Sequence, residues 1–535
     1  MNSNTLETLQ FDNRFVKQLP ADTETANYRR LVTGACYSWV NPTPVRAPTL
    51  VSYSKEVATL LGLDQASCES DQFTRIFTGN ELLDNMQAYA QCYGGFQFGN
   101  WAGQLGDGRA INLGEVVNAE GEHWTLQLKG AGPTPYSRSA DGLAVLRSSV
   151  REFLCSEAMY HLGVPTTRAL SLTLTGEQVR RDMFYDGNPA DEPGAVVCRV
   201  APSFTRFGSF QIFAAQGDIK LLKQLVDFTI INDFPHLGKP DKGCYLAWFS
   251  EVCRSTAELI VHWQRVGFVH GVMNTDNMSI LGLTIDYGPY GWLEDYNPDW
   301  TPNTTDAAER RYRFGNQGQI AHWNLGQLAN AIYPLIEEVE PLEQALAEYN
   351  DHFEQGYNTM MAAKLGLRCY QAETDQLRIV ELFQVMALVE TDMTIFFRNL
   401  ANIDCLDTAL DSVDNDALLR PLIEAYYQPE QLTDAFKKRI ADWLRSYLKR
   451  VRQESVDYSI RRKQMNAVNP KYVFRNYLAQ LAIDKAEQGD FSMVNELLDL
   501  FRAPYDEQPE HQHYAAKRPD WAKVRAGCSM LSCSS

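Results

Sequence analysis

Glycines, a lysine and a glutamate occur along this chain in an order that could bind the phosphates of a nucleotide. Gly106 and Gly108 lie in a turn followed by Arg109, Lys129 ends a run that alternates apolar and polar residues, and Glu152 comes later in a helical pattern. Glycines let backbone N–H groups approach phosphate oxygens, a lysine neutralises phosphate charge, and a glutamate can orient the lysine. Each motif alone is common at hairpins and strand ends. Their order is what predicts a phosphate site.

A second group of polar residues follows in the C-terminal half. The loop 270–277 (His-Gly-Val-Met-Asn-Thr-Asp-Asn) precedes Asp286 in the string Asp-Tyr-Gly. Protein kinases place a His-Arg-Asp-x-x-x-x-Asn loop and an Asp-Phe-Gly segment after the same Gly, Lys and Glu series. In that alignment Asn277 and Asp286 take the metal-binding positions, and Val272 takes the position of the catalytic Asp. Because valine cannot accept a proton, Asp276 is the carboxylate of this loop that could replace the base.

Further residues could complete the phosphate site, and the sequence leaves each of them open. Glu157 lies a little over one turn along the same helix and is an alternative partner for the lysine. Arg199 and Arg206 lie in a stretch without a neighbouring acid, so they are either solvated surface residues or fork-shaped phosphate donors. Asp141 and Gly142 form either an ordinary turn or part of the phosphate site, and the pattern favours the turn.

The elements that must position these residues form two unequal lobes. Residues 96–104 and 110–116 are expected to be strands on either side of the glycine turn, and 123–129 is a strand by its period of two. Residues 146–162 read as an amphipathic helix that ends at Gly163. From about 215 helical patterns dominate, interrupted by a β-like segment at 278–285.

We predict an α+β fold with a small β-rich N-lobe and a large helical C-lobe. The expected divisions are an N-terminal extension (1–90), an N-lobe with the nucleotide clamp (91–214), a helical C-lobe with the catalytic loop and metal site (215–505) and a tail with Cys528 and Cys533 (506–535).

Composition narrows the class of protein. The chain has 535 residues, 45% of them hydrophobic and 22% charged, which is ordinary globular composition, and its net charge is −18. We expect no nucleic-acid partner, because so acidic a chain has no general attraction to phosphate backbones. No apolar run approaches the roughly 20 residues of a membrane helix, and the first residues do not resemble a signal peptide. We therefore expect a cytoplasmic monomer without membrane contact, whose eleven cysteines, with no C-x-x-C pair, are mostly buried thiols.

Several long strings resemble the selenoprotein O family (SelO, also called YdiU proteins). The resemblance covers most of the chain, and the ending Cys533-Ser534-Ser535 is similar to that of bacterial-type members. The remaining matching strings are 104–109, 128–132, 134–138, 145–154, 270–277, 286–289, 465–466 and 469–472.

The resemblance implies a protein-kinase-like (pseudokinase) fold that binds ATP in a reversed orientation and transfers AMP to Ser, Thr or Tyr hydroxyls of proteins, with release of pyrophosphate. Reversal would expose the α-phosphate to the acceptor and explain Val272. The resemblance also implies Asp276 as the base, Asn277 and Asp286 as ligands of Mg²⁺, and Glu152 as the partner of the clamp lysine. Mn²⁺ and UMP transfer from UTP, associated with some bacterial members, stay open. The nucleotide clamp that it implies consists of Gly106, Gly108, Arg109, Lys129, Asp141, Gly142, Arg199, Arg206 and Asp286.

The tail departs from the family pattern. Members with selenocysteine have a Cys-x-x-Sec ending, whereas Met530 stands three residues before Cys533, and residues 297–303 lack the cysteine that can pair with the tail in some relatives. Redox control by that pairing is therefore not predicted. Two other functions also stay open: a non-catalytic nucleotide-binding pseudokinase scaffold, and an ordinary kinase that transfers the γ-phosphate.

Overall fold

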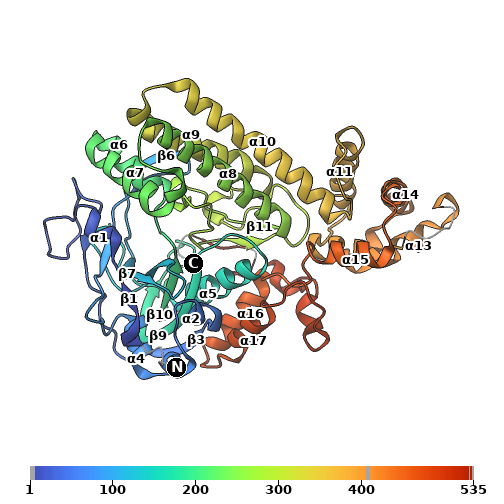
Figure 1. Ribbon diagram of the computed structural model, residues 1–535. Helices are drawn as coiled ribbons and strands as arrows, with labels where there is room; N and C mark the ends of the chain where they lie inside the picture. The colour runs from blue at the N-terminus through green and yellow to red at the C-terminus, as the bar shows by residue number, and fades with distance from the viewer. Residues whose placement is uncertain (1–5, 405–409, 529, 533–535) are drawn as a thin grey trace.

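The computed structural model describes residues 6–404, 410–528 and 530–532. An antiparallel sheet with a long helix forms one lobe and helices dominate the other (Figure 1), so the predicted α+β, two-lobed, kinase-like fold is confirmed. The sheet has the strand order β2-β4-β7-β8-β10-β9-β3, and β1 pairs with β7. The strand bounds are Gln10–Phe11 (β1), Tyr37–Trp39 (β2), Thr49–Tyr53 (β3), Tyr89–Gln91 (β4), Ala110–Val117 (β7), His123–Lys129 (β8), Arg168–Arg181 (β9) and Ala190–Ala201 (β10).

The first 90 residues contribute to this same sheet. β2 lies at one edge beside β4, and β3 lies at the other edge beside β9. The division expected near residue 90 therefore falls within the sheet, and the three boundaries between the four expected segments stay predictions. The short helices of this segment are α1 (Arg14–Gln18), α2 (Lys55–Leu60), α3 (Gln65–Cys68) and α4 (Asp71–Thr78).

A hairpin stands where the chain passes from β4 to β7. β5 (Gly94–Gln97) and β6 (Asn100–Gln104) pair with each other rather than with the main sheet. The single strand expected at 96–104 is wrong because Phe98 and Gly99 both have positive φ, at 49° and 83°. Two such residues make the tight turn that reverses a strand. The segment Gly106–Arg109 consequently joins this hairpin to β7, instead of joining two paired strands.

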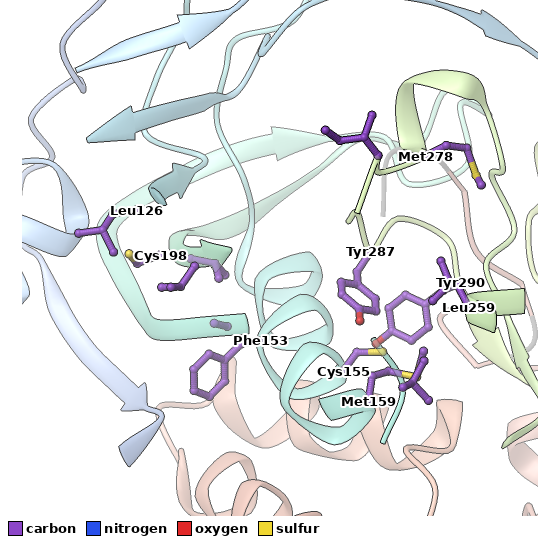
Figure 2. Packing of buried hydrophobic residues seen from close by; sticks show 14 of the residues in the cluster. Leu126, Phe153, Cys155, Met159, Cys198, Leu259, Met278, Tyr287 and Tyr290 are labelled. Carbon is purple, nitrogen blue, oxygen red and sulfur yellow. The ribbon is translucent and has the colours of Figure 1, made fainter. Parts of the chain in front are cut away.

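Helix α5 (Leu146–His161) is held by apolar packing on two sides. One side meets the main sheet and the other meets the segment that follows Asp286 (Figure 2). Burying each large apolar side chain stabilises this arrangement by about 1.5–3 kcal/mol. This packing fixes helix α5, and with it Glu152, between the two lobes. The packed residues include Phe153, Cys155 and Met159 of α5, Leu126 and Cys198 of the sheet, and Tyr287 and Tyr290 after Asp286.

The helical lobe carries the second polar group on a loop between β11 (Phe268–Val269) and β12 (Gly291–Trp292), which pair with each other. The strand expected at 278–285 is wrong, since this segment makes only isolated bridges through Ser279 and Thr284 in the described chain. Late in the chain, α16 and α17 return to lie against α5 (Figure 1). The remaining helices are α6 (Phe207–Gln216), α7 (Ile219–Asp233), α8 (Lys242–Val266), α9 (Gln317–Ile336), α10 (Val339–Lys364), α11 (Ala372–Met386), α12 (Met393–Leu400), α13 (Asn415–Leu419), α14 (Asp434–Gln453), α15 (Tyr458–Asn466), α16 (Asn476–Ala486) and α17 (Ser492–Leu500).

Cysteines follow the expected pattern where the structure describes them. Cys36, Cys155, Cys198 and Cys253 are buried free thiols. Cys528 is also buried, and burial raises the pKa of its thiol to about 11. Cys533 lies outside the described residues. Over the ranges that are described, none of the helices combines the length and apolar character needed to cross a membrane.

Candidate active site

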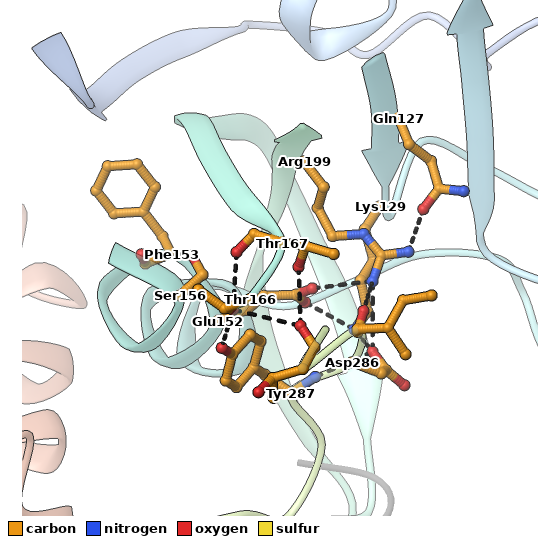
Figure 3. A network of polar contacts seen from close by, with 12 residues as sticks. Gln127, Lys129, Glu152, Phe153, Ser156, Thr166, Thr167, Arg199, Asp286 and Tyr287 are labelled. Atoms are coloured by element: carbon orange, nitrogen blue, oxygen red, sulfur yellow. Dashed lines mark hydrogen bonds and ion pairs between the residues drawn. The ribbon is translucent and has the colours of Figure 1, made fainter. Parts of the chain in front are cut away.

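Four charged side chains from both lobes meet in one network (Figure 3). Lys129 Nζ lies 2.7 Å from Glu152 Oε2 and 2.5 Å from Asp286 Oδ1. Arg199 Nη1 lies 3.2 Å from Glu152 Oε1 and 3.5 Å from Asp286 Oδ1. Two cations and two carboxylates therefore balance one another. A nucleotide at this position would meet two cationic donors already oriented by acids.

The sheet explains why these cations converge. Arg199 on β10 is directly opposite Gln127 on β8, so their side chains share a face, and Lys129 lies two residues further along β8 on that same face. Arg199 also donates a hydrogen bond to the Gln127 side chain. Glu157 does not approach this network, because it accepts two hydrogen bonds from Arg168, at 2.8 and 2.7 Å. The structure thus pairs the lysine with Glu152 and not with its alternative.

The electrostatics of Asp286 reflect its neighbours. Burial opposes ionisation of this carboxyl group, but Lys129 and Arg199 outweigh it and hold the pKa well below its ordinary value. Arg109, which is half-buried, lowers the pKa further. Asp286 is therefore a carboxylate throughout the physiological pH range.

The loop 270–277, which we call the catalytic loop from its position in the kinase alignment, places Asp276 near enough to Asp286 for the two charges to interact. Arg206 Nη1 donates a 2.8 Å hydrogen bond to the backbone oxygen of Asp276. Asn277 Nδ2 donates to the Val272 carbonyl at 3.0 Å, which closes the loop. Burial raises the pKa of Asp276 to about 6 and lowers that of His270 to about 4. A carboxylate with such a pKa can accept a proton near neutral pH, whereas valine at 272 cannot.

Two pairs of predicted clamp residues lie in tight turns. Gly106 and Gly108 pack against Tyr136, where a Cβ would come within 2.4 Å of its ring and 2.9 Å of its carbonyl oxygen, respectively. A Cβ on Gly142 would meet the Gly132 backbone at 2.3 Å. Asp141 pairs with Arg181 at 2.7 Å. The contacts of these four residues explain their turns. By contrast, Lys129 and Arg199 contact Glu152 and Asp286, and Arg206 contacts the backbone of Asp276.

The donor chemistry at Asn277 and Asp286 fits Mg²⁺. Both offer side-chain oxygens, which Mg²⁺ prefers, and it commonly takes one or two protein ligands with phosphate oxygens and water completing its shell. Asn277 uses its amide nitrogen for Val272, which leaves its oxygen for a cation. In a different group, Glu56, Glu157 and His161, the possible ligand atoms lie within 4.8 Å of one another. Arg502 pairs with Glu56 and Arg168 with Glu157, so these acids already have cationic partners.

Sequence reasoning missed the β5–β6 hairpin. Its tip lies against the catalytic loop, where Gln97 Nε2 is 3.2 Å from Asp276 Oδ2. Tyr93, just before the hairpin, lies beneath the Arg206 guanidinium, 4.4 Å from ring centre to Cζ. A usable signal was present, since Gly94, Gly95 and Gly99 cluster over a few residues, as glycines do where backbone must pass closely.

The fold is kinase-like, and its loop 270–277 carries a carboxylate at Asp276, whereas Val272 occupies the position of the kinase catalytic Asp. A family model described as "Protein adenylyltransferase SelO" matches residues 25–502. The chain belongs to this SelO family, which is a family of protein nucleotidyltransferases.

Curated relatives match over the full length. A protein of Rhodopirellula baltica named "Protein nucleotidyltransferase YdiU" is 61% identical and covers 98% of this chain and 99% of its own. Proteins with the same name from Azoarcus sp. and Flavobacterium johnsoniae are 59% and 56% identical, each covering 99% of this chain and 100% of their own. The resemblance found in the sequence is therefore confirmed.

Proposed function

We propose that this protein is an adenylyltransferase that moves AMP from ATP to hydroxyl side chains of other proteins and releases pyrophosphate. One observation carries the proposal: a network of ion pairs among Lys129, Glu152, Arg199 and Asp286 adjoins a loop that has Val272 at the usual base position and Asp276 as its carboxylate. Family membership and the names of the relatives support the same activity.

In the proposed reaction, an acceptor hydroxyl donates its proton to Asp276 as its oxygen forms a bond to the α-phosphorus. The bond between that phosphorus and the bridging oxygen of the β-phosphate breaks, and pyrophosphate leaves with the electron pair. Lys129, Arg199 and Arg206 would stabilise the charge that develops on pyrophosphate. Asn277 and Asp286 would hold Mg²⁺, which would supply further neutralisation of the phosphates.

The experiment uses ATP labelled at either the α- or the γ-phosphate, incubated with the purified protein and a cell lysate. Label from the α-position on protein supports the proposal. Label from the γ-position on protein would instead identify an ordinary kinase, and nucleotide binding without protein label would identify a scaffold. Parallel reactions with α-labelled UTP, and with Mn²⁺ in place of Mg²⁺, determine the preferred nucleotide and metal. Mass spectrometry of labelled proteins determines whether Ser, Thr or Tyr is modified.

A further inference from the structure

The β5–β6 hairpin is anchored on the catalytic loop by its backbone. The Phe96 amide donates to Thr275 Oγ1 at 2.8 Å. The Phe98 amide donates to Asn274 Oδ1 at 3.1 Å and lies 3.0 Å from the Tyr312 hydroxyl. These contacts join the hairpin, which belongs to the N-lobe, to the residues immediately before Asp276. These hydrogen bonds therefore fix the position of the hairpin relative to the loop.

Aromatic rings support the same arrangement from the helical lobe. The Phe96 ring meets Trp323 of α9 edge-on, with centroids 5.6 Å apart. The Phe98 ring lies 5.4 Å from that of Tyr312. Aromatic pairs of this kind contribute about 0.5–1.5 kcal/mol each beyond their buried area. The hairpin tip is thus seated by packing as well as by hydrogen bonds.

Two residues of β5 face the carboxylate of Asp276. The pairing of β5 with β6 is irregular between Gly94 and Phe96, and Gly95 and Gln97 both approach Asp276, whereas the Phe96 ring packs on Trp323. A Cβ on Gly95 would lie 2.8 Å from Asp276 Oδ1, so the glycine backbone covers that oxygen. Gln97 Nε2 lies 3.2 Å from Oδ2. Asp276 is consequently only 8% exposed, and its Oδ1 has no hydrogen-bond partner among the residues that the structure describes.

We propose that Gln97 is a positioning residue for Asp276, a role that rests on the proposed function. With Oδ1 covered by Gly95, Oδ2 is the oxygen left to accept the proton of the acceptor hydroxyl. A carboxylate oxygen has two lone pairs, so Oδ2 can bind the Gln97 amide and the hydroxyl together. The amide fixes the rotation of the carboxylate and thereby aims the second lone pair. Gln97 itself touches neither nucleotide nor acceptor in this scheme.

The first test compares Gln97→Leu with Gln319→Leu, a matched change at an exposed glutamine of α9. Steady-state transfer of α-label, ATP affinity by calorimetry and the melting temperature are measured for both variants and the wild type. We expect kcat of Gln97→Leu to fall about 10- to 100-fold, the ratio that corresponds to one hydrogen bond to a charged group. KM for ATP, ATP affinity and melting temperature should stay at wild-type values. Gln319→Leu should match the wild type throughout.

A second variant perturbs the other oxygen, Oδ1, of the Asp276 carboxylate. Gly95→Ala adds a methyl group that must push Asp276 aside, and Gly95 has no positive φ that would strain an alanine. It should also lose kcat with ATP affinity retained. Gly326→Ala is its matched control, because the nearest atom to its Cβ would be 3.9 Å away.

The outcomes separate this inference from the proposed function. A wild-type protein that transfers no α-label refutes both. An active wild type with unchanged kcat in Gln97→Leu refutes the positioning role alone. The positioning role is also refuted if Gln97→Leu loses ATP affinity or melting temperature together with kcat, since that result indicates a structural role for the side chain.

Discussion

Two buried glutamates on α5 allow the nucleotide network to be tested against a matched control. Glu152 accepts from Lys129 at 2.7 Å and from Arg199 at 3.2 Å, whereas Glu157 accepts from Arg168. Both are almost fully buried and paired with cations. Replacing either with glutamine keeps its shape and removes its charge. The free energy of unfolding should therefore fall by about 1.5–3 kcal/mol in each variant, as expected for loss of a hydrogen bond to a charged group.

The two variants should differ sharply in catalysis. Without Glu152, Lys129 and Arg199 would both rely on Asp286, which would displace the lysine from its proposed phosphate-binding position and compete with the proposed metal. Losing one charge-assisted contact in the transition state lowers kcat/KM for AMP transfer by about 10- to 100-fold. Glu157→Gln should keep wild-type kcat/KM, since Arg168 lies outside the network. Urea unfolding and α-label transfer provide the two measurements. An equal loss of kcat/KM in both variants would show that Glu152 acts only through stability, and no loss in Glu152→Gln would remove it from the site.

Three further predictions concern the base, the metal and the buried carboxyl group of Glu294. Asp276→Ala should retain ATP binding and melting temperature but lose α-label transfer; undiminished transfer would exclude it as the base. A chelator of divalent cations should abolish transfer by the wild type and added Mg²⁺ should restore it, while Asn277→Ala should require more Mg²⁺ for half-maximal rate; transfer that persists with chelator would contradict the proposed metal. Burial raises the pKa of Glu294 from an ordinary 4.5 to about 7, despite its contact with Arg518, so the folded protein holds a proton that the unfolded chain releases. That stabilisation is complete below the unfolded pKa and lost as pH rises through 7, amounting to about 3 kcal/mol at about 1.4 kcal/mol per unit. Glu294→Gln should thus become more stable relative to the wild type between pH 4.5 and 8, and parallel stability profiles of the two proteins would disprove it.

Local patterns in the sequence predicted much of the site. Strand alternation located Lys129 and helical periodicity located Glu152, because both signals are local and do not depend on tertiary packing. The order of the motifs along the chain then linked these two residues to Asp286. Contacts between residues that lie far apart in the sequence were harder to predict. The expected strand at 278–285 failed because β11 and β12, only two residues each, pair across the loop instead. Gln97 was missed because its partner Asp276 is brought near only by the folding of the hairpin over the other lobe.

Placement of β2 and β3 at opposite margins of the sheet has a practical consequence for anyone shortening this protein. A version beginning at residue 91 would lack both outer strands and leave rows of unpaired amide and carbonyl groups on β4's neighbour β7 and on β9. Bare strand margins of that kind recruit other chains and promote aggregation. The first 90 residues, expected from the sequence to be an extension, therefore complete both margins of the sheet.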